Sequence, residues 1–370
     1  MTDREVKLNY DDVSIVPEVI SRISTRTMCD CTDSNNMLPI IAAPMSTVVD
    51  EKSMVEFYKC GIYSVLPRTL PIEVRREYLF NVNKYKCFVA VSLAEFEDLF
   101  IYNMNTYQRC IPSRVCIDVA SGHQLRILDM IKRAKTRYPD ICIMAGNIGN
   151  PLTYLEYEKV GVDYCRVGIG TGSGCLTSSN TGIHYPQFSL LEEIYKLKCE
   201  HKCKCKIVAD GGIKKNRDIQ KALLFADYVM IGGLFNKAID SAGEVRYGNC
   251  YFHLFGERVL RPIKTLLLKG RKVRKITPRI IDLMKSGKVE FVKEFYGMST
   301  KKAQKLINSD KALKTSEGIV TTNKVEYTLA GWAENERDYL RSAMSYTNST
   351  TLEEYKGSRY VRLCSVAYNN

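Results

Sequence analysis

The chain has 370 residues, of which 45% are hydrophobic and 26% charged, and this balance excludes a disordered or fibrous protein. Its formal net charge of +13 suits a phosphorylated ligand, although lysines spread over helix faces more often form a solvated surface. No apolar run approaches the roughly 20 residues of a membrane span, and the N-terminus lacks the apolar core of a signal peptide, so we expect a cytoplasmic protein without a membrane partner.

Eight short apolar runs follow one another along the chain, and each is followed by a segment with helical periodicity. The runs are nearly continuous rather than alternating, which is typical of strands buried on both faces of a parallel sheet. The eight predicted strands are Ile40–Met45, Tyr63–Leu66, Cys87–Ser92, Val115–Ala120, Cys142–Asn147, Tyr164–Gly170, Lys206–Gly212 and Tyr228–Gly233.

Eight strand–helix units in succession predict a closed (β/α)₈ barrel, the TIM-barrel fold. An open, doubly wound sheet is the alternative. A barrel places functional groups at the carboxyl ends of its strands, and the glycine and polar residues of this sequence gather at those ends.

Beyond the eighth strand the alternation of strands and helices stops. Residues 245–294 form a strongly basic excursion whose function the sequence does not reveal. Residues 331–370 are expected to form a C-terminal helix and tail, with an amphipathic pattern over Ala333–Ser345. No segment of roughly 50–200 residues interrupts the strand units as a second domain would, so we expect residues 1–370 to form one barrel domain.

The loop after the sixth strand combines glycines at alternating positions with a thiol and a hydroxyl, in Gly168-Ile-Gly-Thr-Gly-Ser-Gly-Cys175-Leu-Thr177. A thiol displayed by such a loop at the barrel mouth is a candidate nucleophile. The alternative is that Cys175 is one more unreactive thiol among 14 cysteines, most of which lie in apolar runs.

Two glycine pairs follow the seventh and eighth strands, in Asp210-Gly-Gly212 and Gly232-Gly233. Barrels commonly bind phosphate in these two loops, because glycines expose backbone N–H groups to an anion. Asp210 could accept hydrogen bonds from ribose hydroxyls. The glycines could also merely form tight turns, but their positions favour a nucleotide monophosphate.

The motif GIGTGSGCLT resembles the catalytic cysteine loop of the IMP dehydrogenase/GMP reductase family. The motifs PIIAAPMSTV, DVASGH, MAGN, DGGI, MIGG, FYGMS and SEG occur in the order found in that family and cover nearly the whole chain. The resemblance implies a homo-tetramer of catalytic domains without the inserted regulatory CBS domains of most dehydrogenases.

The resemblance further implies that Cys175 attacks carbon 2 of the purine and forms a covalent thioimidate, while Thr177 and Glu317 relay protons. In a GMP reductase the attack expels ammonia from GMP, and hydride from NADPH then yields IMP. In an IMP dehydrogenase, hydride leaves IMP for NAD and water releases XMP.

The resemblance also implies binding positions. Those for the nucleotide are Ser173, Asp210, Gly211, Gly212, Gly232, Gly233, Gly297, Met298, Ser299, Lys314, Ser316 and Gly318, and residues 295–330 are the loop and flap that contact it. Those for the cofactor are Asp118, Val119, Ala120, Ile169, Gly170 and Met298. The carbonyl groups of Gly170, Gly172 and Cys175 match a monovalent-cation site, which would hold potassium.

Three features favour the reductase within this family. The stretch Thr181–Leu191 and the motif FYGMS are similar to those of GMP reductases. The Arg-Tyr pair with which the dehydrogenase activates water is missing, because residues 299–314 contain no arginine. The regulatory domains are also absent.

Four departures qualify this interpretation. Lys314 stands where the reductase pattern has an arginine, Ser46 replaces the usual aspartate, the basic stretch is longer than the family's connection, and the C-terminal RSAMSYTNSTTLEEY resembles both enzymes. A dehydrogenase therefore remains the first alternative. A catalytically silent barrel that binds nucleotide or nucleic acid through its basic excursion is the second, although we expect no nucleic-acid partner because the catalytic residues are intact.

Overall fold

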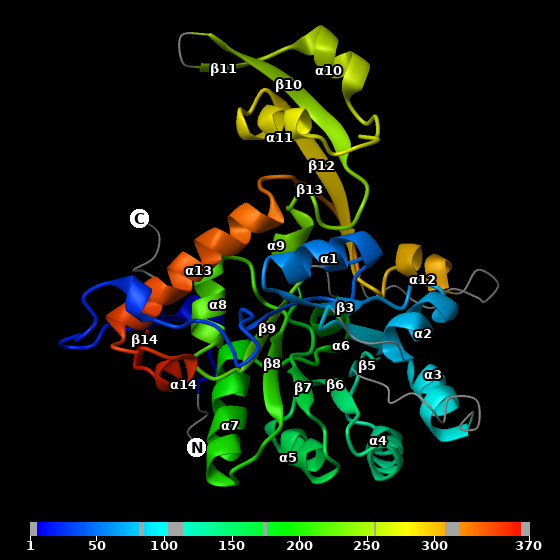
Figure 1. Cartoon of the computed structure of the whole chain (residues 1–370), viewed down its shortest axis with the longest axis vertical. Coiled ribbons are helices and arrows are strands. Elements are labelled where there is room, and N and C mark those ends of the chain that lie inside the picture. Colours follow the sequence, from blue (N-terminus) through cyan, green and yellow to red (C-terminus); the bar gives the residue numbers. More distant parts are fainter. Residues whose placement is uncertain are drawn as a thin grey trace.

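The computed structural model describes residues 6–80, 85–102, 114–172, 176–254, 257–307 and 318–363. Its centre is a closed barrel of eight parallel strands (Figure 1). Strand β2 pairs with both β3 and β9, so the sheet has no open edge, which confirms the TIM barrel and excludes the open sheet. The barrel strands are β2 (Ile40–Ala42), β3 (Tyr63–Leu66), β4 (Phe88–Val91), β5 (Arg114–Asp118), β6 (Cys142–Ile148), β7 (Tyr164–Val167), β8 (Lys206–Asp210) and β9 (Tyr228–Ile231).

Every predicted run overlaps one of these strands. Most of the predicted carboxyl ends were wrong because the runs extend too far, whereas the runs for β5 and β6 miss one strand residue each, Arg114 and Ile148. The run predicted as Lys206–Gly212, for example, leaves the extended conformation after Asp210. Gly211 and Gly212 there have φ values of +99° and +78°, which a strand does not contain. The residues beyond the strands form the loops at the barrel mouth.

Two apolar layers stabilise the barrel. Inward-facing residues such as Val65, Met144 and Met230 fill its interior, and the outward-facing residues pack against the surrounding helices. Helix α4, for example, buries Ile127 and Ile131 on one face. The helices that follow the strands are α1 (Glu51–Lys59), α2 (Ile72–Phe80), α3 (Leu93–Glu97), α4 (Leu125–Arg137), α5 (Pro151–Lys159), α6 (Thr177–Thr181), α7 (Gln187–Glu200), α8 (Asn216–Ala222) and α9 (Gly233–Asn236).

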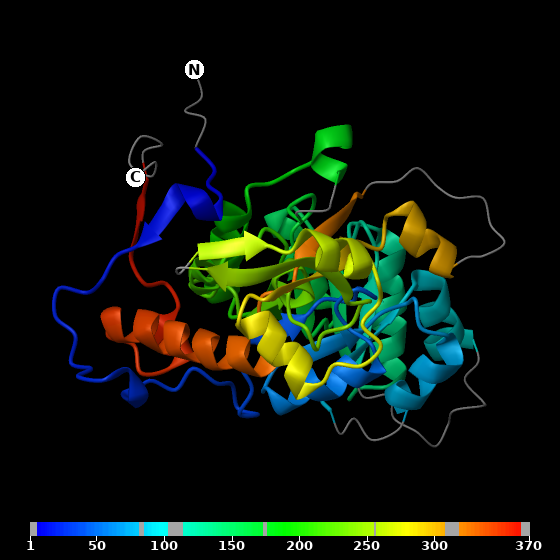
Figure 2. The ribbon, with the colours of Figure 1, turned by 90° about the horizontal axis from the view of Figure 1, so that it is seen from above.

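A small antiparallel sheet stands beyond one end of the barrel (Figure 1) and over it when seen from above (Figure 2). We call it the finger, residues 245–296 with β13. The strands lie in the order β11 (Glu257–Leu260), β10 (Arg246–Leu254), β12 (Val289–Tyr296) and β13 (Val320–Lys324). Together with α10 (Pro262–Leu268) and α11 (Pro278–Lys285), they enclose a separate hydrophobic cluster that includes Cys250, Met284 and Phe291.

The N- and C-terminal segments meet on one side of the barrel. Strand β1 (Val13–Ile15) pairs antiparallel with β14 (Tyr360–Arg362). Helix α13 (Leu329–Tyr346) contains the predicted Ala333–Ser345 helix, and its Trp332 packs edge-on against Phe235 with 4.7 Å between ring centroids. The remaining α-helices of the described residues are α12 (Lys301–Ile307) and α14 (Leu352–Tyr355), and short 3₁₀- or π-helical turns lie at Tyr10–Asp12, Arg26–Met28 and Asp98–Tyr102. None of the described helices is both long and apolar enough to span a bilayer.

Candidate active site at the barrel mouth

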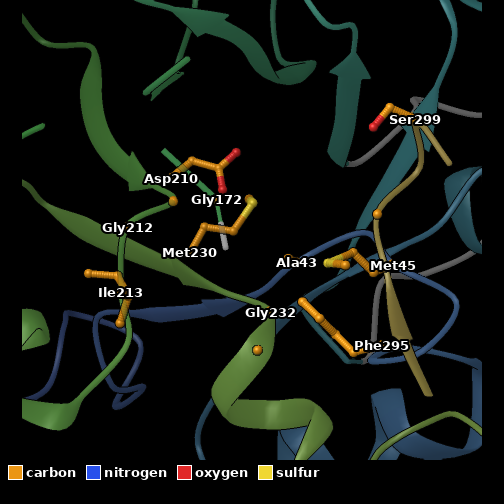
Figure 3. A pocket seen from close by; sticks show the side chains of 13 residues that line it. Ala43, Met45, Gly172, Asp210, Gly212, Ile213, Met230, Gly232, Phe295 and Ser299 are labelled. Carbon is orange, nitrogen blue, oxygen red and sulfur yellow. The ribbon is translucent and has the colours of Figure 1, made fainter. Parts of the chain in front are cut away.

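A cavity of about 170 Å³ opens at the barrel mouth, between the strand-end loops and the base of the finger. Figure 3 shows the side chains of Asp210 and Met230 on one side of it and those of Met45 and Phe295 on the other. Its lining residues are Ala43, Met45, Gly172, Asp210, Gly211, Gly212, Ile213, Met230, Gly232, Gly233, Phe295, Gly297 and Ser299.

The structure thus brings together eight of the predicted binding and cation-site residues, which are far apart in the sequence. These are Gly172, Asp210, Gly211, Gly212, Gly232, Gly233, Gly297 and Ser299. Of the other predicted residues, Met298 is half-buried beside the lining residues Gly297 and Ser299, and Gly318 is buried just before β13. The predicted residues Ser173, Cys175, Lys314, Ser316 and Glu317 lie outside the described part of the chain.

The apolar walls of this cavity are not evident from the sequence pattern. Met45 and Phe295 belong to motifs that were recognised, but they line the cavity together only because the base of the finger lies beside the loop after β2. Met230 is an inward-facing residue near the end of β9, which a period of two along the strand could have indicated. The combination of apolar walls, glycine loops and one carboxylate can hold a ligand with a flat ring, hydroxyl groups and an anionic end.

Two glycines allow the loops after β7 and β8 to lie against each other. At Gly168, with φ of +135°, a Cβ atom would lie 2.3 Å from the backbone oxygen of Asp210. At Gly211 a Cβ atom would lie 2.1 Å from Oγ1 of Thr171. No side chain fits at either position, so the loop that leads to Cys175 is held directly against the Asp210 loop.

A buried arginine joins two carboxylates beneath this cavity. Arg166 on β7 donates to Oδ1 of Asp118 at 2.8 Å and, through Nη2 and Nε, to Oδ2 of Asp210 at 2.8 and 3.1 Å. Asn147 also donates to Oδ2 of Asp210, at 2.7 Å. The hydrogen bonds recorded for the Asp210 carboxylate within the described residues all go to Oδ2, which leaves Oδ1 to a ligand. A charged residue in a strand otherwise buried on both faces was the sequence signal for Arg166.

The charges of this network stabilise one another. Burial by itself raises the pKa of Asp118, but Arg166 and Arg68, which donates to Asp118 at 3.2 Å, outweigh it and hold that pKa below its ordinary value. Burial by itself lowers the pKa of Arg166, but Asp210, Cys116 and Asp118 hold it well above the usual range. Asp118 and Arg166 are therefore both ionised near neutral pH.

The residues predicted to meet the cofactor lie at the ends of β5 and β7. Asp118 is the last residue of β5, Val119 is half-buried and Ala120 is exposed. Ile169 and Gly170 are half-buried after β7. Through Arg166, this side of the barrel mouth is connected to Asp210 and hence to the cavity.

Two of the three residues of the predicted cation site, Gly170 and Gly172, are described. The Gly170 carbonyl accepts a hydrogen bond from Oγ of Ser178 at 3.2 Å, and Gly172 is exposed. Thr177, the predicted proton carrier, is half-buried and begins α6. These residues lie on either side of the segment that contains Cys175.

Comparison with known proteins identifies the family to which this site belongs. The family model described as "IMP dehydrogenase / GMP reductase domain" matches residues 7–260. The chain belongs to this family. The match covers all eight barrel strands and ends within the finger, at the last residue of β11.

Among similar proteins of this family are several named GMP reductase. The one from Bacillus subtilis is 31% identical over 256 residues, which cover 67% of this chain and 77% of the relative. Those from Oceanobacillus iheyensis and Helicobacter pylori are each 32% identical, over 243 and 257 residues, and the matches cover 64% and 67% of this chain and 72% and 77% of the relatives.

Proposed function

We propose that the chain is a GMP reductase, which converts GMP to IMP and ammonia with NADPH as the hydride donor. The observation that supports this most directly is the cavity at the barrel mouth, where two glycine loops and Asp210 meet apolar walls beside Gly172, three residues before Cys175. The relatives named GMP reductase support the choice of substrate.

In the proposed reaction the nucleotide's phosphate lies against the glycine pairs after β8 and β9, and a ribose hydroxyl donates to Oδ1 of Asp210. The purine lies between Met45, Met230 and Phe295. Holding the base in this way presents its carbon 2 to Cys175, because Gly168 and Thr171, which precede this cysteine in the chain, pack against the Asp210 loop.

The Cys175 thiolate adds to carbon 2 of GMP, and the 2-amino group leaves as ammonia, which gives a thioimidate on the enzyme. Thr177 and Glu317 deliver the proton that the departing nitrogen needs. Addition of a hydride at carbon 2 then releases IMP, and the sulfur leaves again as thiolate. The sum consumes one GMP, one hydride and the protons taken up by ammonia.

The end of β5 fits a nicotinamide riboside. The Asp118 carboxylate is an acceptor for a ribose hydroxyl, and the half-buried Val119 and Ile169 offer apolar surface to a ring. When bound, NADPH supplies the hydride. The side chains of Arg166 and Arg68 keep Asp118 ionised and oriented for this contact.

We further propose a homo-tetramer and a potassium ion held by the carbonyl groups of Gly170, Gly172 and Cys175, because carbonyl oxygens suit a monovalent cation. Light scattering that gives the mass of a single chain would contradict the tetramer. Equal turnover in potassium and in tetramethylammonium salts would contradict the ion.

The test is a product analysis. Protein incubated with GMP and NADPH should yield IMP and ammonia in equal amounts, measured by chromatography and by a coupled ammonia assay. Cys175→Ser should yield neither, whereas Cys199→Ser, which alters an exposed thiol at the end of α7, should behave as wild type. Formation of XMP from IMP and NAD, without IMP from GMP, would favour the dehydrogenase instead.

A further inference from the structure

The end of the finger is the part of the molecule that the proposed reaction does not use. Figure 1 shows α10 and β11 at the end of the finger farthest from the barrel. This end belongs to the basic excursion predicted as residues 245–294, for which the sequence offered no role. Two properties of its surface, one apolar and one electrostatic, identify a partner.

The apolar property is a ridge along α10. Ile263 and Leu266 are 77% and 84% exposed, and Leu267 is 58% exposed. Their spacing of three and four residues places them on one side of the helix. Thr265 fixes that orientation, because it is buried and its Oγ1 accepts a hydrogen bond from the Cys250 backbone N–H at 2.9 Å. Neighbouring aliphatic side chains that protrude this far into water mark an interaction site.

An apolar hollow adjoins the ridge. It has a volume of about 520 Å³, and its walls include Phe252, Leu260 and Leu267. The ridge and the hollow together form one continuous apolar surface at the end of the finger. Arg261 and Lys264 border this surface.

The electrostatic property is a concentration of positive charge. Residues 246–288 contain twelve lysines and arginines but only two acidic residues, Glu257 and Asp282. This stretch therefore carries a net charge of +10, against +13 for the whole chain. Arg261, Lys264 and Lys269 are exposed on or next to α10. The partner must therefore be anionic.

Among anionic partners, a lipid surface fits both properties. A second copy of the finger would bring two strongly positive surfaces together, and these repel each other. A single-stranded nucleic acid would pair with the lysines and arginines, but its bases stack on aromatic side chains, whereas the ridge on α10 is aliphatic. A helix with exposed aliphatic residues and a basic border is what peripheral proteins insert at the boundary between headgroups and acyl chains.

We propose that the end of the finger docks onto an anionic bilayer surface. Ile263 and Leu266 enter the boundary between headgroups and acyl chains, and Arg261, Lys264 and Lys269 meet the lipid phosphates. The expectation of no membrane partner rested on the lack of an apolar span, and a helix that lies in the membrane interface needs no span. The inference does not depend on the proposed reaction.

The test is sedimentation of the full chain with vesicles. Wild type should sediment with vesicles of phosphatidylcholine mixed with phosphatidylserine, should remain in solution with phosphatidylcholine alone, and should be released by salt. The double variant Ile263→Ser/Leu266→Ser should lose affinity by about tenfold or more, because two aliphatic side chains no longer leave water. Both residues are exposed, so the fold should persist.

The matched control is Leu125→Ser/Leu152→Ser, which removes two exposed leucines from the barrel, on α4 and α5. It should bind vesicles as wild type does. The proposal is overturned if wild type ignores anionic vesicles or if the Ile263/Leu266 variant binds them unchanged. It is also overturned if that variant lowers the particle mass in light scattering, since the ridge would then join copies of the chain.

Discussion

Replacing Arg166 by methionine should strongly destabilise the fold and weaken both ligand sites. The Arg166 side chain is 7% exposed, and the Asp118 and Asp210 side chains that it joins are 12% and 15% exposed. Methionine fills a similar length but leaves both carboxylates without this partner. Breaking a buried ion pair from one side costs about 3–5 kcal/mol, and we expect about 4 kcal/mol here because Arg68 and Asn147 still contact the carboxylates.

Two further variants separate charge from geometry. Arg166→Lys keeps the charge, but a single ammonium group cannot contact Asp118 and Asp210 as the guanidinium does. We therefore expect a loss of stability smaller than that of Arg166→Met. Arg68→Met removes only the 3.2 Å contact to Asp118 and should cost about 1–2 kcal/mol. Urea denaturation measures these losses, and Michaelis constants for GMP and NADPH report the two sites. Both constants should rise in Arg166→Met.

The pH dependence gives an independent check on the same residue. The pKa of Asp118 is depressed in the folded protein, so its contribution to stability is present above about pH 4, the ordinary value for aspartate, and is lost as the pH falls through the depressed pKa. Without Arg166 that loss should begin at higher pH. If the free energy of unfolding of Arg166→Met lay within about 1 kcal/mol of the wild-type value, and stability were lost at the same low pH, the role of Arg166 would be refuted.

The remaining predictions concern single positions. Glu317→Gln should slow turnover by about 10²–10⁴-fold because proton transfer is impaired, and an unchanged rate in a steady-state assay would move the relay elsewhere. Gly168→Ala should cost about 1–3 kcal/mol or more in urea denaturation, since its Cβ would overlap the Asp210 backbone oxygen; a neutral effect would contradict the loop packing. Burial raises the pKa of Glu336 to about 7, so the folded state binds the proton more tightly than the unfolded state between about pH 4.5 and 7. Stability should therefore fall by about 3 kcal/mol as the pH rises through that window, and Glu336→Gln should flatten the profile; an equally steep profile in the variant would exclude Glu336 as the cause.

The barrel could be predicted because each strand is a nearly continuous apolar run. Tyr63–Leu66 was predicted with the bounds that the structure has, since a proline and two polar residues follow it directly. The finger could not be predicted in the same way. Strand β10 alternates only weakly between buried and half-buried residues, and β12 pairs with β13 across a connection of more than twenty residues. Such long-range pairing leaves no local pattern.

The site also contains residues that the sequence reveals and residues that depend on contacts between distant segments. Its glycines and Asp210 were found because their positions at strand ends are visible in the sequence. Met45 and Phe295 were not assigned, because their binding role arises only where the loop after β2 faces the end of β12. Arg166 was missed because its partners lie on other strands, 48 and 44 residues away.

The absorbance of reduced nicotinamide tests the proposed GMP reductase activity most directly. One cuvette holds the purified protein with GMP and NADPH, and a second holds it with IMP and NAD. We expect a loss of absorbance in the first cuvette that depends on GMP and disappears in Cys175→Ser. No change in the first cuvette, with a gain in the second, would contradict it and identify a dehydrogenase.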